Sequence, residues 1–294
     1  TDQQDRLFFA GIIVIAANAG GAWSPLGDVT TTMLWIGNQI SAGAIVLKVF
    51  LPSLACLAVP LLYLNWKMRK DAPSIPAIRE KKSTQTTTAR ERKIVFSLGV
   101  GGLLFVPIFK TLTHLPPYMG ILLSLGVLWV VTELMHHEKD TEEKGVLSVV
   151  HALRKIDAAS VLFFLGILIS ISALQSAGML SELATWLSET IGNQDVIVVA
   201  IGLLSAVVDN VPLVAAAQGM YSLEQFPTDH TFWLFLAYCA GTGGSALIIG
   251  SAAGVAAMGM EQINFFWYLK KISLLALLGY FAGVAAYLLQ AQIF

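Results

Sequence analysis

Apolar segments about as long as a membrane-spanning helix follow one another along most of the chain, separated by short polar stretches. The unbroken ones cover residues 44–66, 94–113, 118–135, 158–177 and 272–289. A helix needs roughly 20 predominantly apolar residues to cross the hydrocarbon core of a bilayer. The pattern therefore predicts an all-α polytopic membrane protein.

Two other apolar segments, residues 7–36 and 232–258, are interrupted near their middle. Each interruption has a Gly-Gly pair followed, after five other residues, by one more glycine: Gly20, Gly21 and Gly27 in the first, and Gly243, Gly244 and Gly250 in the second. Glycine in this density, with Pro25 added in the first segment, interrupts a helix. We therefore expect each segment to form two half-helices joined by an unwound loop.

A third unusual stretch, residues 195–220, places Asp209, Asn210 and Pro212 inside an apolar run. A charged side chain at the bilayer centre costs roughly 2.5–3.5 kcal/mol even on lenient insertion scales. The apolar arms, about 14 residues before and about 9 after, fall short of the roughly 20 needed for a span. The stretch is typical of a re-entrant hairpin whose tip lines a cavity. The alternative is a surface turn in which Asp209 caps a helix that begins at Pro212.

Positive charges are gathered in one polar segment, residues 67–93, which holds nine of the chain's 18 lysines and arginines. We interpret this segment as a cytoplasmic linker, because cytoplasmic loops carry an excess of Lys and Arg. The segments expected on the opposite side, residues 178–195 and 221–230, contain neither residue. This pattern requires the hairpin to re-enter without crossing, since a full span there would place Lys270 and Lys271 outside.

Composition narrows the class of protein further. Hydrophobic residues make up 56% of the 294 and charged residues 13%, more apolar surface than a soluble domain of this size needs. The expected surroundings are a lipid bilayer, and a net charge of −1 gives no reason to expect a nucleic-acid partner. The sequence shows no nucleophile–base pair, phosphate loop or metal-ligand spacing, which favours a transporter without a cofactor over an enzyme. Cys56 and Cys239 lie in apolar runs and are expected to be small core residues.

The two interrupted segments also match each other. Their glycines have the same spacing at a constant offset of 223 positions, and an unbroken helix follows each segment. In the predicted topology the first runs from inside to outside and the second from outside to inside. The same pattern in opposite orientation is typical of inverted-repeat secondary transporters, whose site lies at the midplane where discontinuous helices meet. We therefore divide the chain into residues 1–66, the end of a first repeat, the linker, and residues 94–294, the second repeat.

Polar side chains on the three irregular segments are the candidate ion ligands. Broken helices expose carbonyl and N–H ends in a dry cavity, and carbonyl, carboxylate, amide and hydroxyl oxygens suit a sodium ion. The candidates are Asp209, Asn210 and Ser205 on the hairpin, Thr242 and Ser245 on the second broken helix, and Asn18, Asp28 and Thr31 on the first. Asp209 is the expected proton carrier, because sodium and a proton would compete for its carboxylate.

Three of these residues have simpler interpretations. Asp28 precedes a Val-Thr-Thr-Thr sequence and could be a plain N-cap of the second half-helix. Thr242 and Ser245 could be small residues that only permit close helix packing. The sequence leaves both interpretations open.

Three long motifs carry a resemblance to a known family: AANAGGAWSPLGDVTTTMLW at 16–35, VVDNVPLVAAA at 207–217 and GTGGSALIIGSAAGVAAMG at 241–259. The chain resembles the NhaD-type sodium/proton antiporters of the ion-transporter superfamily over nearly its whole length. The resemblance implies electrogenic exchange of sodium or lithium for protons by a homodimer, in a bacterial inner membrane or else a plastid envelope. It also implies which residues lie at or near the ion site: Asn18, Asp28, Asp209, Asn210 and Ser245.

The resemblance leaves alternatives for both completeness and function. Members of the family are longer and begin with several helices and a first hairpin that has its own Asp-Asn motif. We therefore expect the N-terminal part of the first repeat to be missing here, either because the sequence is a fragment or because another chain or segment supplies that part. The superfamily also holds arsenite pumps and sodium-coupled dicarboxylate carriers, and the latter have Ser-Asn-Thr where this chain has Val-Asp-Asn-Val-Pro. A membrane subunit that does not transport is the alternative from a different class.

Overall fold

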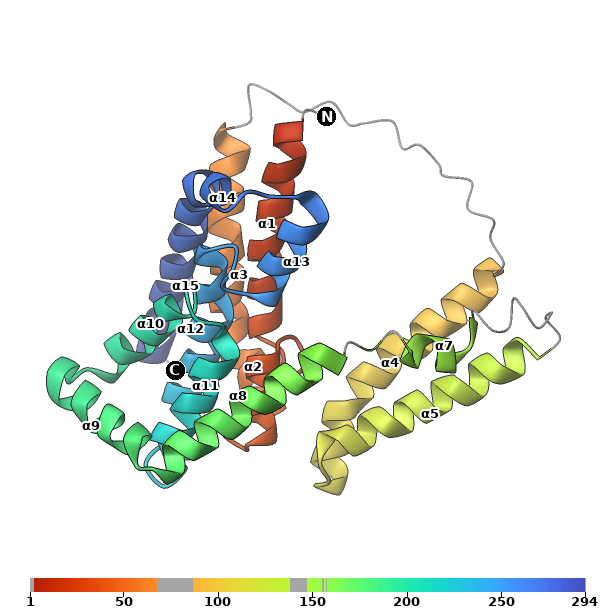
Figure 1. Ribbon diagram of the computed structural model, residues 1–294, viewed down its shortest axis with the longest axis horizontal. Coiled ribbons are helices and arrows are strands. Elements are labelled where there is room, and N and C mark those ends of the chain that lie inside the picture. The colour runs from red at the N-terminus through yellow and green to blue at the C-terminus, as the bar shows by residue number, and fades with distance from the viewer. Residues whose placement is uncertain (1–2, 68–86, 138–146, 155, 157, 294) are drawn as a thin grey trace. The chain divides into compact units, whose positions relative to one another are not determined.

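The structure is a computed structural model that describes residues 3–67, 87–137, 147–154, 156 and 158–293 (Figure 1). Every regular element among these residues is a helix. The chain forms two compact units, one made of residues 1–76 and 166–294 and the other of residues 77–165. This division reflects packing, whereas the division expected from the sequence reflects a repeat, which stays a prediction.

Five helices are long and apolar enough to cross a membrane: Asp5–Ala22, Ala42–Trp66, Ala89–Thr113, Pro117–Met135 and Ser273–Ile293. A sixth span results if Val161–Ser176 and Met179–Ile191, which meet at an angle of 74°, are counted together. These lengths fit the thickness of the hydrocarbon core. For the described residues, the prediction of an all-α polytopic membrane protein is confirmed.

The first unit begins with the first interrupted segment. Its helices are α1 (Gln3–Ala22), α2 (Val29–Ile36) and α3 (Ala42–Lys67). The break between α1 and α2 covers residues 23–28 and contains Pro25 and Gly27, whereas Gly20 and Gly21, which were predicted to interrupt the helix, still belong to α1. Helix α3 continues through Pro52 and Pro60, as the sequence pattern indicated.

The same unit ends with the second interrupted segment. Its elements are α12 (Thr231–Gly243), the 3₁₀ turn η2 (Gly244–Ala246), α13 (Ala252–Glu261), α14 (Phe265–Lys271) and α15 (Ser273–Ile293). The predicted break is present. The predicted last helix, residues 272–289, is present as α15. The short helix α14, which the sequence pattern did not indicate, precedes it.

Four helices precede the second interrupted segment: α8 (Ala158–Ser176), α9 (Met179–Ile191), α10 (Gln194–Leu204) and α11 (Asn210–Met220). Helices α10 and α11 have 11 residues each, so each is roughly 16 Å long at 1.5 Å per residue. That length is about half of a hydrocarbon core of about 30 Å. The pair therefore has the lengths expected of the two arms of a re-entrant hairpin joined by residues 205–209, and its return within the membrane stays a prediction.

Helices α3 and α15 pack side by side and run in opposite directions (Figure 1). Two glycines of α15 permit the close approach: a Cβ on Gly279 would collide with the carbonyl oxygen of Cys56, and one on Gly283 would lie 2.6 Å from that of Pro52. Small residues of this kind allow helix backbones to meet in a membrane. The crossing buries Cys56, and Cys239 is also a buried free thiol, as expected.

The second unit contains α4 (Ala89–Thr113), α5 (Pro117–Met135) and the short helix α7 (Val149–Leu153). Helix α4 begins earlier than the sequence pattern indicated, so residues 89–93 of the predicted linker are helical. The reason is a capping box, in which Thr88 and Glu91 satisfy each other's backbone N–H groups. Residues 68–86 of that linker lie outside the described part.

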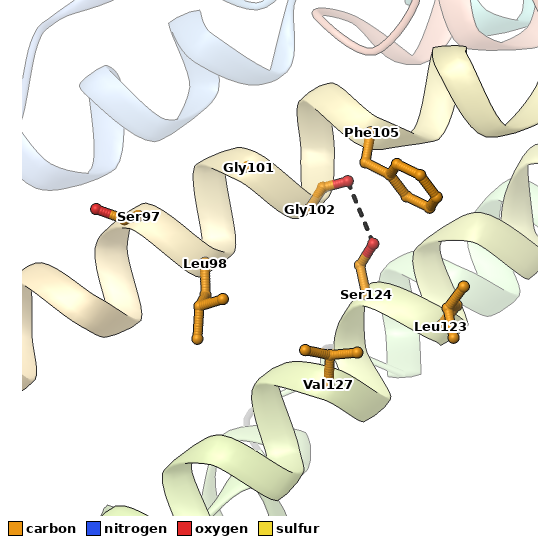
Figure 2. Close-up of a pocket in the computed structure, with 8 residues that line it drawn as sticks. All are labelled: Ser97, Leu98, Gly101, Gly102, Phe105, Leu123, Ser124 and Val127. Atoms are coloured by element: carbon orange, nitrogen blue, oxygen red, sulfur yellow. Dashed lines mark hydrogen bonds between the residues drawn. The ribbon is translucent and has the colours of Figure 1, made fainter.

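A cavity of about 350 Å³ opens between α4 and α5 (Figure 2). Its lining is apolar apart from two serines, and Ser124 Oγ donates a hydrogen bond to the Gly102 carbonyl at 3.2 Å. None of its eight lining residues carries a carboxylate or an amine. This cavity therefore has no group that could exchange a cation for a proton.

Candidate functional site

The break between α1 and α2 holds the carboxylate of Asp28. Asp28 takes the N-cap position of α2: its Oδ1 accepts from the Val29 N–H at 2.7 Å, and Thr31 completes a capping box. Its Oδ2 accepts a hydrogen bond from Thr30 Oγ1 at 2.6 Å. The interpretation of Asp28 as an N-cap is therefore correct, but the cap leaves Oδ2 directed at other partners.

The tip of the α10–α11 hairpin supplies one of those partners. Asn210, the buried first residue of α11, donates from Nδ2 to Asp28 Oδ2 at 3.1 Å. The preceding residue, Asp209, takes the N-cap position of α11, so a second carboxyl directly precedes the residue that binds Asp28. A carboxylate in surroundings of low dielectric favours uptake of a cation or a proton.

The break between α12 and α13 is closed by neutral side chains. Asn18, on α1, donates from Nδ2 to Ser245 Oγ at 2.8 Å and to Ser251 Oγ at 2.9 Å. Ser251 is the N-cap of α13 and accepts from the Gly254 N–H at 3.2 Å. Ser245 is thus part of a hydrogen-bonded contact between the two broken segments, beyond its role as a small residue.

Glycines bring the two sides of each break into backbone contact. A Cβ on Gly21 would lie 2.7 Å from the Gly27 carbonyl oxygen, and a Cβ on Gly250 would lie 2.7 Å from that of Gly244. Real Cβ atoms do not approach an oxygen this closely, so only glycine fits. The predicted structural role of these four glycines agrees with this geometry.

Two backbone hydrogen bonds of the first break recur in the second at the offset of 223 positions. In the first break, the N–H of Gly27 donates to the Ser24 carbonyl and that of Thr32 to the Asp28 carbonyl. In the second, the N–H of Gly250 donates to the Leu247 carbonyl and that of Val255 to the Ser251 carbonyl. All four bonds measure 3.0–3.1 Å. The two breaks therefore share a backbone geometry as well as a glycine spacing.

The contacts between the two breaks correspond in position but differ in chemistry. Gly241 stands 223 positions after Asn18 and has no side chain to offer. A Cβ there would lie 3.2 Å from the Cβ of Ala22 and 3.6 Å from Asp28 Oδ2. Asp28 in turn stands where the second break has Ser251. One crossing is a neutral contact between an amide and hydroxyls, whereas the other contains a carboxylate.

Three of the eight residues predicted to bind the ion, Asn18, Asp28 and Ser245, lie at these two crossings; Asn210 binds Asp28 from α11, and Asp209 directly precedes it. Their roles as ion ligands stay predictions. Two other residues escaped the sequence reasoning, namely Thr30, which donates to Asp28, and Ser251, which accepts from Asn18. The spacing of Thr30, two residues after an N-cap, could have indicated it.

The remaining three predicted residues bond to backbone groups. Thr242 Oγ1 donates to the Tyr238 carbonyl one turn earlier in its own helix at 2.7 Å. Ser205 Oγ donates to the Gly202 carbonyl at 2.7 Å and to the Ala240 carbonyl at 3.2 Å. Thr31 bonds to the backbone of Asp28. These geometries favour structural roles for the three hydroxyls.

Known proteins resemble this chain at the level of family and of individual sequences. The family model described as "Citrate transporter" (CitMHS) matches residues 2–237. Sodium/proton antiporter 1 of Arabidopsis thaliana is 53% identical over 96% of this chain and 48% of its own length. Sodium/proton antiporter 2 of the same plant is 50% identical over 96% of this chain and 67% of its own length.

Bacterial proteins are similar to a lesser degree. The Na(+)/H(+) antiporter NhaD of Alkalimonas amylolytica is 32% identical over 96% of this chain and 61% of its own length. No solved structure matches the chain closely enough to count as related. The chain therefore spans about half to two thirds of the length of the curated relatives it matches.

Proposed function

This chain belongs to the citrate transporter family, and from that premise we propose that it takes part in the exchange of sodium ions for protons across a membrane. The relatives named sodium/proton antiporters support this activity within the family. The match to a transporter family also agrees with the expectation of a transporter over an enzyme.

The observation that carries the proposal is the contact between the hairpin tip and the first break. Asn210 donates from its amide nitrogen to Asp28 Oδ2, and Asp209 directly precedes Asn210, so the start of α11 brings a second carboxyl to the side of Asp28. Exchange of a cation for a proton needs a group that gains a proton when it loses the cation. The contact of Asn18 with Ser245 and Ser251 has no such group, so the exchange belongs to the side of Asp28 and Asp209.

The same contact argues against a citrate-like anion as the substrate, despite the family's description. The side chains that donate to Asp28 are those of Thr30 and Asn210, both neutral. A carboxylate substrate would be repelled by Asp28 and Asp209 and would need cationic or multiple N–H partners instead. A sodium ion is attracted by the same two groups.

We assign Asp209 as the carboxylate shared by sodium and the proton. Asp28 accepts hydrogen bonds from the side chains of Thr30 and Asn210 besides the Val29 N–H, whereas the Asp209 carboxyl faces the backbone N–H groups of Val211 and Asn210. The less constrained carboxylate is better suited to alternate between two ligands. In the topology read from the positive charges, sodium leaves the cytoplasmic side and protons enter from outside.

The test is sodium-evoked proton movement in proteoliposomes that contain the full protein, measured from pH 6.5 to 9.5. Asp209→Asn should abolish it, while Glu182→Gln, which removes an exposed carboxylate on α9, should leave it intact. Exchange that survives Asp209→Asn would exclude Asp209 as the carrier and direct attention to Asp28. Uptake of citrate or arsenite without a sodium response would replace the proposal by one of the alternative transporters.

We also propose that a second helical hairpin covers the first break. Gly243 and Gly250 are buried against the α10–α11 hairpin, where a Cβ on Gly250 would lie 2.6 Å from the Ala206 carbonyl oxygen. Their counterparts Gly20 and Gly27 are exposed, and a Cβ on Gly20 would meet nothing within 4 Å. Gly20→Ala in the full protein should therefore impair exchange, whereas Gly259→Ala, at an equally open position of α13, should not.

For the membrane, the identity to two plant proteins exceeds that to the bacterial NhaD proteins, 53% and 50% against 29–33%. We therefore favour the plastid envelope over the bacterial inner membrane. Fractionation of a tagged protein in its own host would decide between them.

A further inference from the structure

Arg6 and Glu261 form a two-pronged ion pair outside the two breaks. Arg6 lies near the start of α1, and Glu261 is the last residue of α13. Arg6 donates from Nη2 to Glu261 Oε1 at 2.9 Å and from Nε to Oε2 at 2.5 Å. The pair joins residues 255 positions apart, so it ties the first broken segment to the second.

Neither charge is placed to stabilise its own helix. A positive side chain near a helix N-terminus and a negative one at a C-terminus both oppose the helix dipole. Arg6 and Glu261 are in these unfavourable places, so each is better explained by its partner than by the helix that carries it. A fork of two parallel N–H···O bonds also fixes the orientation of the two groups.

A second tie occupies the corresponding positions at the other end of the segments. Asp229 stands 223 positions after Arg6 and precedes α12. Its N–H donates to the Gln39 carbonyl at 2.8 Å, and its Oδ1 accepts from the Ser41 N–H at 2.5 Å. Thr228 Oγ1 donates to the carbonyl of Asn38, the counterpart of Glu261, at 2.7 Å. The start of each broken segment is thus bound to the end of the other.

Both breaks lie between these two ties. The position of α1 along its own axis relative to α12 and α13 determines two contacts at the breaks. These are the hydrogen bond of Asn18 to Ser245 and the approach of Gly241 to Asp28. A tie at each end fixes that position. Loss of one tie would allow the Asp28 side of the crossing to shift relative to Gly241 and the hairpin tip.

We propose that Arg6 and Glu261 are positioning residues, which hold the two broken segments in register so that the site at Asp28 keeps its geometry. The inference rests on the proposed exchange function and adds a group that touches neither ion. The two ties differ in kind, because the one at Asp229 consists of hydrogen bonds to backbone groups. The pair at Arg6 is partly exposed, with side-chain exposures of 67% and 26%, and is therefore screened by salt.

The test compares Arg6→Gln, Glu261→Gln and the exchanged pair Arg6→Glu with Glu261→Arg in proteoliposomes of the full protein. Asp5→Asn, which removes a neighbouring charge from the same turn of α1, is the matched control. Each single change should raise the sodium KM threefold or more while the maximal rate stays within twofold. The exchanged pair should restore KM to within twofold of wild type.

A pair that only stabilises the fold would behave differently. Its loss would lower the Tm, or change nothing, as is found for many exposed ion pairs. In either case the sodium KM would stay unchanged. That result, or an exchanged pair that fails to restore KM, would overturn the proposal. So would single variants that match Asp5→Asn.

Absence of exchange in the wild-type protein would refute the proposed function and not this inference. Hydrogen exchange of the backbone at residues 23–28 and 247–251 then decides. Arg6→Gln should speed amide hydrogen exchange at both breaks relative to Asp5→Asn. Equal rates of hydrogen exchange in the two variants would reject the positioning role.

Discussion

Gly21 and Gly27 face each other across the first break so closely that neither can carry a Cβ, because a Cβ on Gly21 would lie 2.7 Å from the Gly27 carbonyl oxygen. The end of α1 and the residue before Asp28 are therefore in backbone contact. This contact fixes the position of the Asp28 backbone, from which the carboxylate extends. The same relationship holds between Gly244 and Gly250.

Gly21→Ala should destabilise the protein, because backbone atoms, unlike a flexible side chain, have to move to admit the methyl group. The cost expected for such overpacking is about 1–3 kcal/mol. Gly259→Ala meets nothing within 4 Å and should be neutral or gain up to about 1 kcal/mol from helix propensity. Thermal unfolding in detergent, followed by size-exclusion fluorescence, measures both, and equal Tm values would contradict the prediction.

Asn210→Ala should weaken sodium binding, because it removes the amide that orients Asp28 from the hairpin. A hydrogen bond to a charged group contributes roughly 1.5–3 kcal/mol, so the apparent sodium affinity should fall about tenfold or more. Asn193→Ala is the control, since Asn193 caps α10 at the far end of the same hairpin. Sodium-dependent thermal stabilisation gives the affinities, and a similar loss in both variants would mean that only hairpin stability matters.

Thr30→Val and Thr242→Val form a matched pair of hydroxyl deletions. Thr30 donates to Asp28 Oδ2 at 2.6 Å, whereas Thr242 donates to a carbonyl of its own helix. Loss of the Thr30 bond should reduce the rate of exchange about tenfold or more, because a hydrogen bond to a charged acceptor contributes roughly 1.5–3 kcal/mol. Thr242→Val should change it less than about threefold, because a helix carbonyl already has its backbone partner. Initial rates of proton movement decide, and an inactive Thr242→Val would restore that residue as an ion-ligand candidate.

Asn18→Ala should lower the Tm, because it removes both hydrogen bonds that join α1 to the second break. Two neutral bonds contribute about 1–3 kcal/mol in net terms. A double-mutant cycle with Ser251→Ala separates this contact from the role of Ser251 as a helix cap. The two changes should be less than additive, and strict additivity would show that the contact contributes nothing.

The pair of Arg6 with Glu261 should weaken in acid. The hydrogen bond from Arg6 lowers the pKa of the Glu261 carboxyl below its usual range. A carboxyl whose pKa is lower in the folded state stabilises that state above its unfolded pKa, about 4.3, and this effect disappears as the pH falls through the folded value. The coupling between Arg6→Gln and Glu261→Gln in Tm should thus stay constant from pH 6 to 9 and vanish well below pH 4. A coupling that changes between pH 6 and 9 would point to another titrating group.

Much of the fold could be predicted because membrane helices depend on local composition. The spans, both breaks and the two short helices α10 and α11 follow from apolar run length and from glycine and proline positions. The start of α4 was misplaced, since the charges at residues 89–93 indicated a loop while the capping box of Thr88 and Glu91 begins a helix there. The boundary between α14 and α15 was not predicted, because no change in composition marks it.

The site was predictable in its residue types and not in its pairings. Asp28, Asn210 and Asn18 were found because polar groups in apolar runs are costly. Which hydroxyl reaches Asp28 depends on the geometry after the N-cap, and that geometry selects Thr30 over Thr31. The tie of Arg6 to Glu261 joins positions 255 apart, which no local pattern reveals.

The crossing of α3 and α15 that hides Cys56 has a practical consequence. The two thiols among these 294 residues, Cys56 and Cys239, are only 2% and 0% exposed, so water-soluble maleimides should not reach them in the folded protein. A single cysteine introduced at Arg6 or at the hairpin tip would then carry the label alone. Within these 294 residues, no cysteine has to be removed before site-directed labelling.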